Sequence, residues 1–210
     1  MFITFEGLDG SGKTTQVKTL AADLKARGRD VLLTREPGGT LIGDKIRSVL
    51  QDRANTAMTS QTELLLFCAS RAQIVSEVIR PRLDAGGVVI CDRFADSTLA
   101  YQGYGRGLDL AFLRQLLTFA TGGLKPDLTL YLDLPPEDGL ARRRQASLFG
   151  EEFSRIDQLE LDFHRRVHQG YLALIAAEPE RWIVIDANQP AEQVQTAILD
   201  VIGSRAGLVT

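Results

Sequence analysis

The fold of this chain is decided by residues 2–15, which read FITFEGLDGSGKTT. The apolar residues at positions 2, 3 and 5 have no helical spacing, which predicts a short buried strand. The pattern Gly-x-x-x-x-Gly-Lys-Thr follows at residues 7–14, and an amphipathic segment begins directly after it. Strand, glycine-rich loop and helix therefore occur in the order that a phosphate-binding loop (P-loop) requires, rather than as a chance glycine turn.

Each residue type in this loop has a physical reason. Glycines permit backbone angles that a side chain would forbid, so successive N–H groups can turn inward around an oxyanion. Lys13 can reach the β- and γ-phosphates of a nucleotide, and the hydroxyl of Thr14 can bind Mg²⁺. The positive end of the following helix dipole faces the same phosphates. The residues expected to bind ATP are Gly7, Leu8, Asp9, Gly10, Ser11, Gly12, Lys13 and Thr14.

Length and composition favour one globular domain over residues 1–210, because 210 residues can bury a sizeable core. The formal net charge of −3 gives no basic excess, so neither a nucleic acid nor an anionic membrane surface is an expected partner. No signal peptide and no apolar run long enough to span a bilayer are evident. Cys68 and Cys91 both lie in apolar segments, which predicts buried reduced thiols and a cytoplasmic protein.

Apolar runs and amphipathic segments alternate along the rest of the chain. The runs at residues 31–33, 88–91, 128–134 and 182–185 predict four further buried strands. Helical spacing is found over about residues 17–24, 42–50, 60–83, 110–120, 136–146, 156–174 and 190–203. This alternation predicts an α/β fold of the P-loop NTPase type, a three-layer sandwich in which helices flank a five-stranded parallel sheet. Ligands then bind at the carboxyl ends of the strands, where Gly7, Arg35 and Asp92 emerge.

Two charged residues follow the third strand directly. Asp92 lies where P-loop enzymes place the acid that manages Mg²⁺ or the attacking group, and the alternative is a solvated turn aspartate. Arg93 could pair with Asp92 or hold a phosphate. We favour the phosphate, because neighbouring side chains leave the end of a strand in different directions.

Arg71 interrupts an apolar helical stripe formed by Leu64, Phe67, Ile74 and Val78. Burying its guanidinium without a partner would be costly. One explanation is a structural salt bridge. We favour the other, in which Arg71 is a planar donor facing a planar polar ligand and Phe67 provides a stacking surface one turn earlier.

Basic residues flank a polar, glycine-containing stretch. Arg142, Arg143 and Arg144 precede it and Arg155 follows it. They could be a solvated helix end, or they could belong to a mobile lid over about residues 142–155 that brings an arginine onto the transferring phosphoryl group.

His164 and His168 are four residues apart on a helix, which is a spacing that can bind zinc. No third ligand at a suitable spacing is evident, so exposed histidines are expected here.

Six segments together resemble the bacterial thymidylate kinase family, which phosphorylates dTMP to dTDP for dTTP synthesis. The resemblance covers nearly the whole chain. Its markers are residues 5–15, 34–40, 66–71, 92–94, 100–103 and 125–128. The third residue of the family's Asp-Arg-Tyr or Asp-Arg-His is Phe94 here, so any polar role of that residue is lost. The resemblance implies ATP and Mg²⁺ as cofactors, with Thr14 and Asp92 at the metal, and a homodimer.

The resemblance also assigns roles in binding dTMP. The implied substrate-binding residues are Asp9, Arg35, Phe67, Arg71, Arg93, Thr98, Tyr101 and Gln102. Asp9 would bind the sugar 3′-hydroxyl, and Arg35 and Arg93 would hold the phosphate. Phe67 would stack on thymine while Arg71 donates to its O4.

At the other side of the base, Thr98 and Gln102 would contact its edge, and Tyr101 would exclude a ribose 2′-hydroxyl. The resemblance also implies that the Glu36–Pro37 peptide is cis, because the chain turns sharply beneath the acceptor phosphate.

The acceptor is a phosphate that is already anionic, so catalysis by positioning and charge neutralisation is expected. The implied catalytic residues are Lys13, Asp92, Arg93, Arg142 and Arg144. Some thymidylate kinases have an arginine in the P-loop where this chain has Gly10, so the missing charge is expected from the lid. Arg142 and Arg144 point about 200° apart on a helix, and we favour Arg144 because it lies nearer the loop.

Two other functions share a P-loop. A deoxynucleoside kinase would need a carboxylate base and fewer phosphate-binding arginines, and the presence of both Arg35 and Arg93 argues against it. A GTP-binding module would usually have an Asn-Lys-x-Asp motif, which the sequence lacks.

Overall fold

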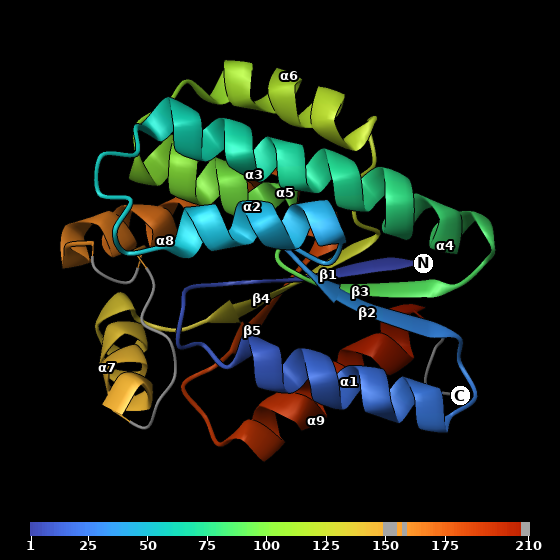
Figure 1. The fold of residues 1–210 in the computed structure, drawn as a ribbon. Helices are drawn as coiled ribbons and strands as arrows, with labels where there is room; N and C mark the ends of the chain where they lie inside the picture. Colours follow the sequence, from blue (N-terminus) through green and yellow to red (C-terminus); the bar gives the residue numbers. More distant parts are fainter. Residues whose placement is uncertain (149–154, 157–158, 207–210) are drawn as a thin grey trace.

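The computed structural model describes residues 1–148, 155–156 and 159–206, without the side chains of residues 205 and 206. Within these residues the strands form one five-stranded sheet in the order β2-β3-β1-β4-β5, and all neighbouring strands are parallel (Figure 1). The strands are β1 (Phe2–Glu6), β2 (Val31–Arg35), β3 (Val88–Asp92), β4 (Leu128–Asp133) and β5 (Trp182–Asp186). The expected five-stranded parallel sheet is confirmed.

Helices cover both faces of this sheet, as the sequence predicts. The longer ones are α1 (Lys13–Ala26), α2 (Leu41–Gln51), α3 (Ser60–Ile74), α6 (Leu110–Thr121), α7 (Pro136–Leu148), α8 (Leu161–Ala177) and α9 (Ala191–Ala206). Shorter segments are η1 (Val75–Ile79), α4 (Arg80–Asp84), α5 (Ala95–Thr98), η2 (Leu99–Gly105) and η3 (Pro179–Arg181). The expected helix over 60–83 is one continuous run, α3-η1-α4, with a π-helical turn inside it. No element was expected over residues 95–105, where α5 and η2 lie.

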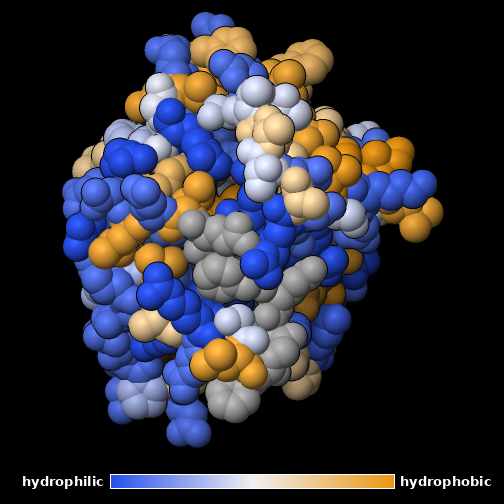
Figure 2. Space-filling model, turned by 60° about the vertical axis from the view of Figure 1, so that its left-hand side comes forward, coloured by the Kyte–Doolittle hydropathy of each residue, from blue (hydrophilic) through white to orange (hydrophobic). Residues whose placement is uncertain are grey.

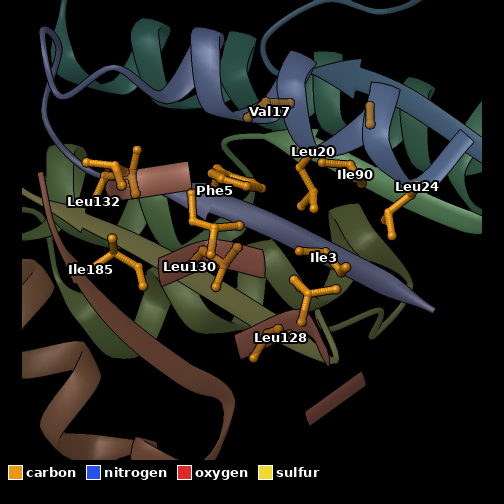
Figure 3. Packing of buried hydrophobic residues seen from close by; sticks show 14 of the residues in the cluster. Ile3, Phe5, Val17, Leu20, Leu24, Ile90, Leu128, Leu130, Leu132 and Ile185 are labelled. Carbon is orange, nitrogen blue, oxygen red and sulfur yellow. The ribbon is translucent and has the colours of Figure 1, made fainter. Parts of the chain in front are cut away.

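One face of the sheet is covered by α1 and α9. Residues alternate along a strand between the two faces, so Ile3 and Phe5 of β1 point to this side. There they pack against Leu20 and Leu24 of α1 in one hydrophobic cluster (Figure 3). The cluster fixes the direction in which α1 leaves the P-loop.

The opposite face packs against α3, η2, α6 and α8. Tyr131 and Trp182 of the sheet belong to a second hydrophobic cluster, together with Leu64 of α3, Tyr101 of η2 and Tyr171 of α8. A third cluster joins β3 to the π-helical turn η1. These clusters hold α3 and η2 close to the carboxyl ends of the strands. Helix α7 extends from the same end of the sheet (Figure 1).

The strand ends meet at one edge of the sheet. Asp92 is in register with Phe5 of β1 and with Arg35 of β2. Of the expected lid over 142–155, residues 149–154 lie outside the described residues, and residues 142–148 belong to α7. In the part of the chain that the structure describes, no helix is long and apolar enough to cross a membrane.

Candidate active site

The P-loop joins β1 to α1 as the sequence predicts. Gly7 has φ +139°, and a Cβ built on it would lie 2.6 Å from the carbonyl oxygen of Leu132 on β4. Gly12 is left-handed with φ 86° and precedes the first residue of α1, Lys13. Both positions therefore need glycine. No acidic residue lies in the first turn of α1, so its positive dipole end is left for an anion.

Lys13 lies inside the loop, where its Nζ donates to the Leu8 carbonyl oxygen at 2.7 Å and to Ser11 Oγ at 3.4 Å. Burial and the nearby Arg93 guanidinium lower the pKa of Lys13 to about 8, against the attraction of Asp9 and Asp92. An anion in the loop would raise this pKa and hold the ammonium charged.

Thr14 and Asp92 meet across the gap between α1 and β3. The Thr14 hydroxyl donates to Asp92 Oδ2 at 3.0 Å. A hydroxyl and a carboxylate at the mouth of a P-loop are the oxygen ligands that Mg²⁺ prefers in such enzymes. The two residues therefore fit the metal site that the sequence predicts.

Arg93 pairs with Asp9 rather than with Asp92 among the described residues. Its Nη2 lies 2.9 Å from Asp9 Oδ1 and donates to the Tyr101 hydroxyl at 3.1 Å. Burial raises the pKa of the Asp9 carboxyl, but Arg93 and Lys13 outweigh it and hold the pKa well below its ordinary value. Arg93 has φ 71°, a strained conformation for a residue with a side chain, and such strain is concentrated at functional sites.

Glu6 lies beneath this pair and is completely buried. It accepts hydrogen bonds from Ser97 Oγ at 2.5 Å, Tyr171 OH at 2.7 Å and the Phe94 backbone N–H at 2.8 Å. Burial and then the nearby Asp96 raise the pKa of Glu6. Because Tyr171 also accepts from Arg93 at 3.3 Å, Glu6 supports the guanidinium from below.

Arg71 is 1% exposed, and the structure contains the partner that a structural salt bridge requires. The other explanation, a planar ligand facing Arg71, stays a prediction. Arg71 Nε and Nη2 reach Glu36 Oε2, each at 2.7 Å, so the structural salt bridge exists. Its Nη1 donates to Thr98 Oγ1 at 2.8 Å and its Nη2 to the Phe94 carbonyl oxygen at 3.0 Å. The expected cis peptide at Glu36–Pro37 is confirmed.

A cavity of ≈ 810 Å³ joins these groups. One part is lined by the P-loop, and the other by α3, the end of α5 and η2, through Phe67, Arg71, Thr98, Tyr101 and Gln102. Figure 2 turns the strand-end side of the molecule toward the reader, and its surface is largely hydrophilic with scattered hydrophobic residues. One cavity therefore unites a phosphate-binding loop with a pocket that has an aromatic ring and planar donors.

Arginines surround the phosphate end of the cavity. Arg35 and Arg93 line it as expected, and so does Arg47 of α2, which donates to the Pro37 carbonyl oxygen at 2.9 Å. On α7, Arg142 and Arg143 line the cavity, while Arg144 is exposed and is not one of the lining residues. Arg142 also donates to the Ala187 carbonyl oxygen at 3.2 Å, after β5.

Comparisons with known proteins agree with this geometry. The family model described as thymidylate kinase matches residues 5–198. The chain belongs to the thymidylate kinase family. It is similar to the thymidylate kinase of Roseiflexus castenholzii (54% identity, covering 96% of this chain and 92% of that one) and to that of Desulfovibrio desulfuricans (57% identity, covering 92% and 91%). The crystal structure of thymidylate kinase from Ehrlichia chaffeensis has a TM-score of 0.79 and 35% identity, with 96% of this chain and 98% of that chain covered.

In this member of the thymidylate kinase family, the third residue of the Asp-Arg-Phe segment is part of the core. Phe94 is fully buried, and its ring meets Phe2 edge-on with centroids 4.9 Å apart. Its backbone N–H and carbonyl oxygen still serve Glu6 and Arg71.

The expectation for the histidines is wrong. His164 is 2% exposed, and His168 Nε2 lies 2.8 Å from Asp133 Oδ1. Helix α8 packs against both η2 and the sheet, so its buried face is wider than the apolar stripe indicates. No cluster of three or more metal-ligating residues exists in the described part of the chain. Cys68 and Cys91 are buried and free, as expected.

Four further residues at this site were not singled out from the sequence. Arg47 and Tyr171 looked like an ordinary helix charge and a core aromatic. Glu6 lies in a strand, and Glu63 lies in the first turn of α3, where an acid is common. In each case the signal is a long-range contact that the sequence pattern does not contain.

Proposed function

We propose that this protein transfers the γ-phosphoryl group of ATP to dTMP and releases ADP and dTDP. The single observation that supports this function is the shared cavity. The P-loop lies at one end and the ring of Phe67 with the Arg71 guanidinium lies at the other. The arginines between them suit an acceptor that is itself a phosphate ester.

ATP occupies the P-loop in this proposal. The backbone of Gly7 to Gly12 surrounds the β-phosphate, and Lys13 neutralises the β- and γ-phosphates. Thr14 and Asp92, whose side-chain oxygens lie 3.0 Å apart, would hold Mg²⁺. The metal would neutralise charge on the donor phosphates and help align the acceptor.

dTMP occupies the α3–η2 end of the cavity. Arg35 and Arg93 bind its phosphate, and Arg47 lines the same wall. Phe67 stacks on the base and Arg71 donates to O4.

At the sugar, Asp9 binds the 3′-hydroxyl. Tyr101 excludes a 2′-hydroxyl, since its OH donates to Asp9 at 3.3 Å and its ring lies beside Arg93. Thr98 and Gln102 contact the base edge.

The charge on the transferring phosphoryl group is neutralised by Lys13, Mg²⁺, Arg93 and an arginine of α7. Arg144 is proposed on its position nearest the loop, although it does not line the cavity, and Arg142 is the second candidate because it does. Asp92 holds the metal and the acceptor phosphate.

The active form is proposed to be a cytoplasmic homodimer. Helices α2, α3 and α6 lie side by side (Figure 1) and expose large apolar side chains, among them Leu65 at 58%, Phe112 at 54% and Phe119 at 85%. A contiguous exposed apolar face of this kind suits a second copy of the chain. The free buried thiols of Cys68 and Cys91 fit a reducing compartment.

A steady-state assay with ATP and five acceptors tests the function. dTMP should be phosphorylated with the highest kcat/KM, and dUMP, thymidine, AMP and CMP should be poorer acceptors. Efficient use of thymidine would instead indicate a deoxynucleoside kinase, and equal use of AMP would refute the assignment to dTMP.

A further inference from the structure

Glu63 is the centre of a buried charge cluster behind the cavity. It lies on α3, four residues before Phe67 and eight before Arg71, so the three share one helical face. Its side chain is 2% exposed, and it does not itself line the cavity. Phe67, Arg71 and Gln102 do line the cavity, so Glu63 lies directly behind the proposed base site.

Three donors converge on this carboxylate. Gln102 Nε2 donates to its Oε1 at 2.9 Å. Arg106, which directly follows η2, donates to Oε1 from Nε at 3.2 Å and to Oε2 from Nη2 at 2.9 Å. Arg155 donates to Oε2 as well, and its Nε donates to the Leu50 carbonyl oxygen at 3.3 Å. Oε1 is therefore shared by Gln102 and Arg106, and Oε2 is held by two guanidinium groups.

The protonation state of Glu63 follows from these contacts. Burial raises its pKa, but the hydrogen bonds from Arg106, Gln102 and Arg155 outweigh burial and hold the pKa below its ordinary value. An ionised carboxylate only accepts hydrogen bonds. It therefore decides which end of the Gln102 amide faces it: the NH₂ group must point to Glu63, and the carbonyl oxygen takes the other direction.

We propose that Glu63 is a positioning residue that fixes the side-chain amide of Gln102 so that its carbonyl oxygen faces the base edge. This inference rests on the proposed function, in which Gln102 contacts the pyrimidine. A carbonyl oxygen there accepts from the N3–H of thymine or uracil. Cytosine has an unprotonated N3 that is itself an acceptor, so its lone pair and those of the Gln102 carbonyl oxygen would repel each other. Glu63 thereby selects pyrimidines with an imide N–H without touching them.

The pair dUMP and dCMP tests this selection, because both lack the 5-methyl group and differ at N3, which faces Gln102, and at position 4, which faces Arg71. Arg71 is the same in every variant below, so a change in the ratio of the two substrates on substitution reports on Gln102. Wild-type enzyme should use dUMP about 10-fold or more better than dCMP in kcat/KM, since an unpaired buried polar group costs about 1–3 kcal/mol. dTMP is the reference substrate in all assays.

The informative substitution is Glu63→Gln. Two guanidinium groups, those of Arg106 and Arg155, donate to the Oε2 position, whereas only the Nε of Arg106 donates to Oε1 from a guanidinium. The new amide oxygen is therefore held at Oε2, and the new NH₂ group faces Gln102. Gln102 must then turn its oxygen to position 63 and its NH₂ to the base. We expect kcat/KM for dUMP to fall and that for dCMP to rise, so that their ratio drops about 10-fold. KM for ATP should stay unchanged.

A loss of packing would lower both rates together, so a gain with dCMP distinguishes orientation from damage. Glu77→Gln is the matched control, because it neutralises an exposed carboxylate on the same helical run. It should leave the ratio unchanged. Glu63→Asp keeps an ionised acceptor and should retain the preference for dUMP.

Neutralising Glu63 leaves two arginines without a carboxylate, so the single variant could fail to fold. The double variant Glu63→Gln/Arg106→Gln removes one cation together with the anion, and the same drop in ratio is expected for it. An unchanged ratio in whichever folded variant is assayed, or wild-type enzyme that uses dUMP and dCMP equally, overturns the inference. Wild-type enzyme that does not phosphorylate dTMP overturns the proposed function instead.

Discussion

The buried pair of Glu36 and Arg71 makes a measurable prediction about stability. Burial raises the pKa of Glu36 from its ordinary value of 4.5 to about 7, although Arg71 acts in the opposite direction. The side chain is 2% exposed, so solvent does not screen this effect. Between pH 4.5 and 7 the folded protein therefore keeps a proton that the unfolded chain releases.

The sign and size of the effect follow from this difference. Because the folded state binds more protons in this window, the free energy of unfolding falls as pH rises. The pKa difference of about 2.5 corresponds to about 3 kcal/mol, since one pKa unit equals about 1.36 kcal/mol. This contribution is fully present below pH 4.5 and is lost as pH rises through 7, with about 2 kcal/mol lost between pH 5 and 7.

Glu36→Gln removes the titration but keeps an oxygen that can accept from Arg71. Urea unfolding followed by circular dichroism at pH 5, 6 and 7 gives both free energies by linear extrapolation. The wild-type value should fall relative to the variant by about 2 kcal/mol over this range. Glu77→Gln should instead run parallel to the wild type. Parallel curves for Glu36→Gln and wild type would mean that Glu36 stays ionised throughout, which would refute the reasoning.

Three further substitutions test the proposed site. Arg71→Ala should raise KM for dTMP by about 5- to 150-fold, and far more than KM for ATP. The substitution also breaks the buried pair with Glu36, which costs about 3–5 kcal/mol of stability. Equal effects on both KM values in folded protein would favour a purely structural arginine. Arg144→Ala should lower kcat by about 10³–10⁵-fold if Arg144 acts as an arginine finger. Single-turnover phosphoryl transfer by alanine variants at 142, 143, 144 and 155 measures this effect. Near-wild-type rates in all four variants would exclude these arginines as the source of the catalytic charge. Asp92→Asn should raise the Mg²⁺ concentration for half-maximal activity by about 10- to 100-fold, and an unchanged Mg²⁺ dependence would remove Asp92 from the metal site.

The sheet was predictable because β1, β3 and β4 are buried along nearly their whole length, and the partly exposed edge strands β2 and β5 also read as short apolar runs. The segment at 95–105 was not, because its small, polar and aromatic residues show no apolar stripe. It is helical because Leu99, Ala100 and Tyr101 pack against α8 and α6. Tertiary contacts decide the structure of such a segment.

The residues of the site also fall into two groups: those that local sequence rules reveal and those that only long-range contacts reveal. Lys13, Thr14 and Asp92 follow from local rules, namely a glycine loop and the end of a strand. Arg71 was noticeable because a charge interrupts an apolar stripe. Glu63 gave no such signal, since its partners are 39, 43 and 92 residues away.

Gly10 shows why the arginine of the P-loop is absent in this chain and where a substitute can come from. It has φ +85°, and a Cβ built on it would lie 2.3 Å from the Gly139 carbonyl oxygen on α7. A Cβ on Gly139 would in turn lie 2.8 Å from the Asp9 carbonyl oxygen. The start of α7 therefore packs backbone to backbone against the P-loop and closes position 10 to any side chain. The same contact brings Arg142, three residues further along α7, to the cavity wall. We therefore expect the arrangement that excludes a side chain from position 10 to be the one that lets an arginine of α7 supply the positive charge.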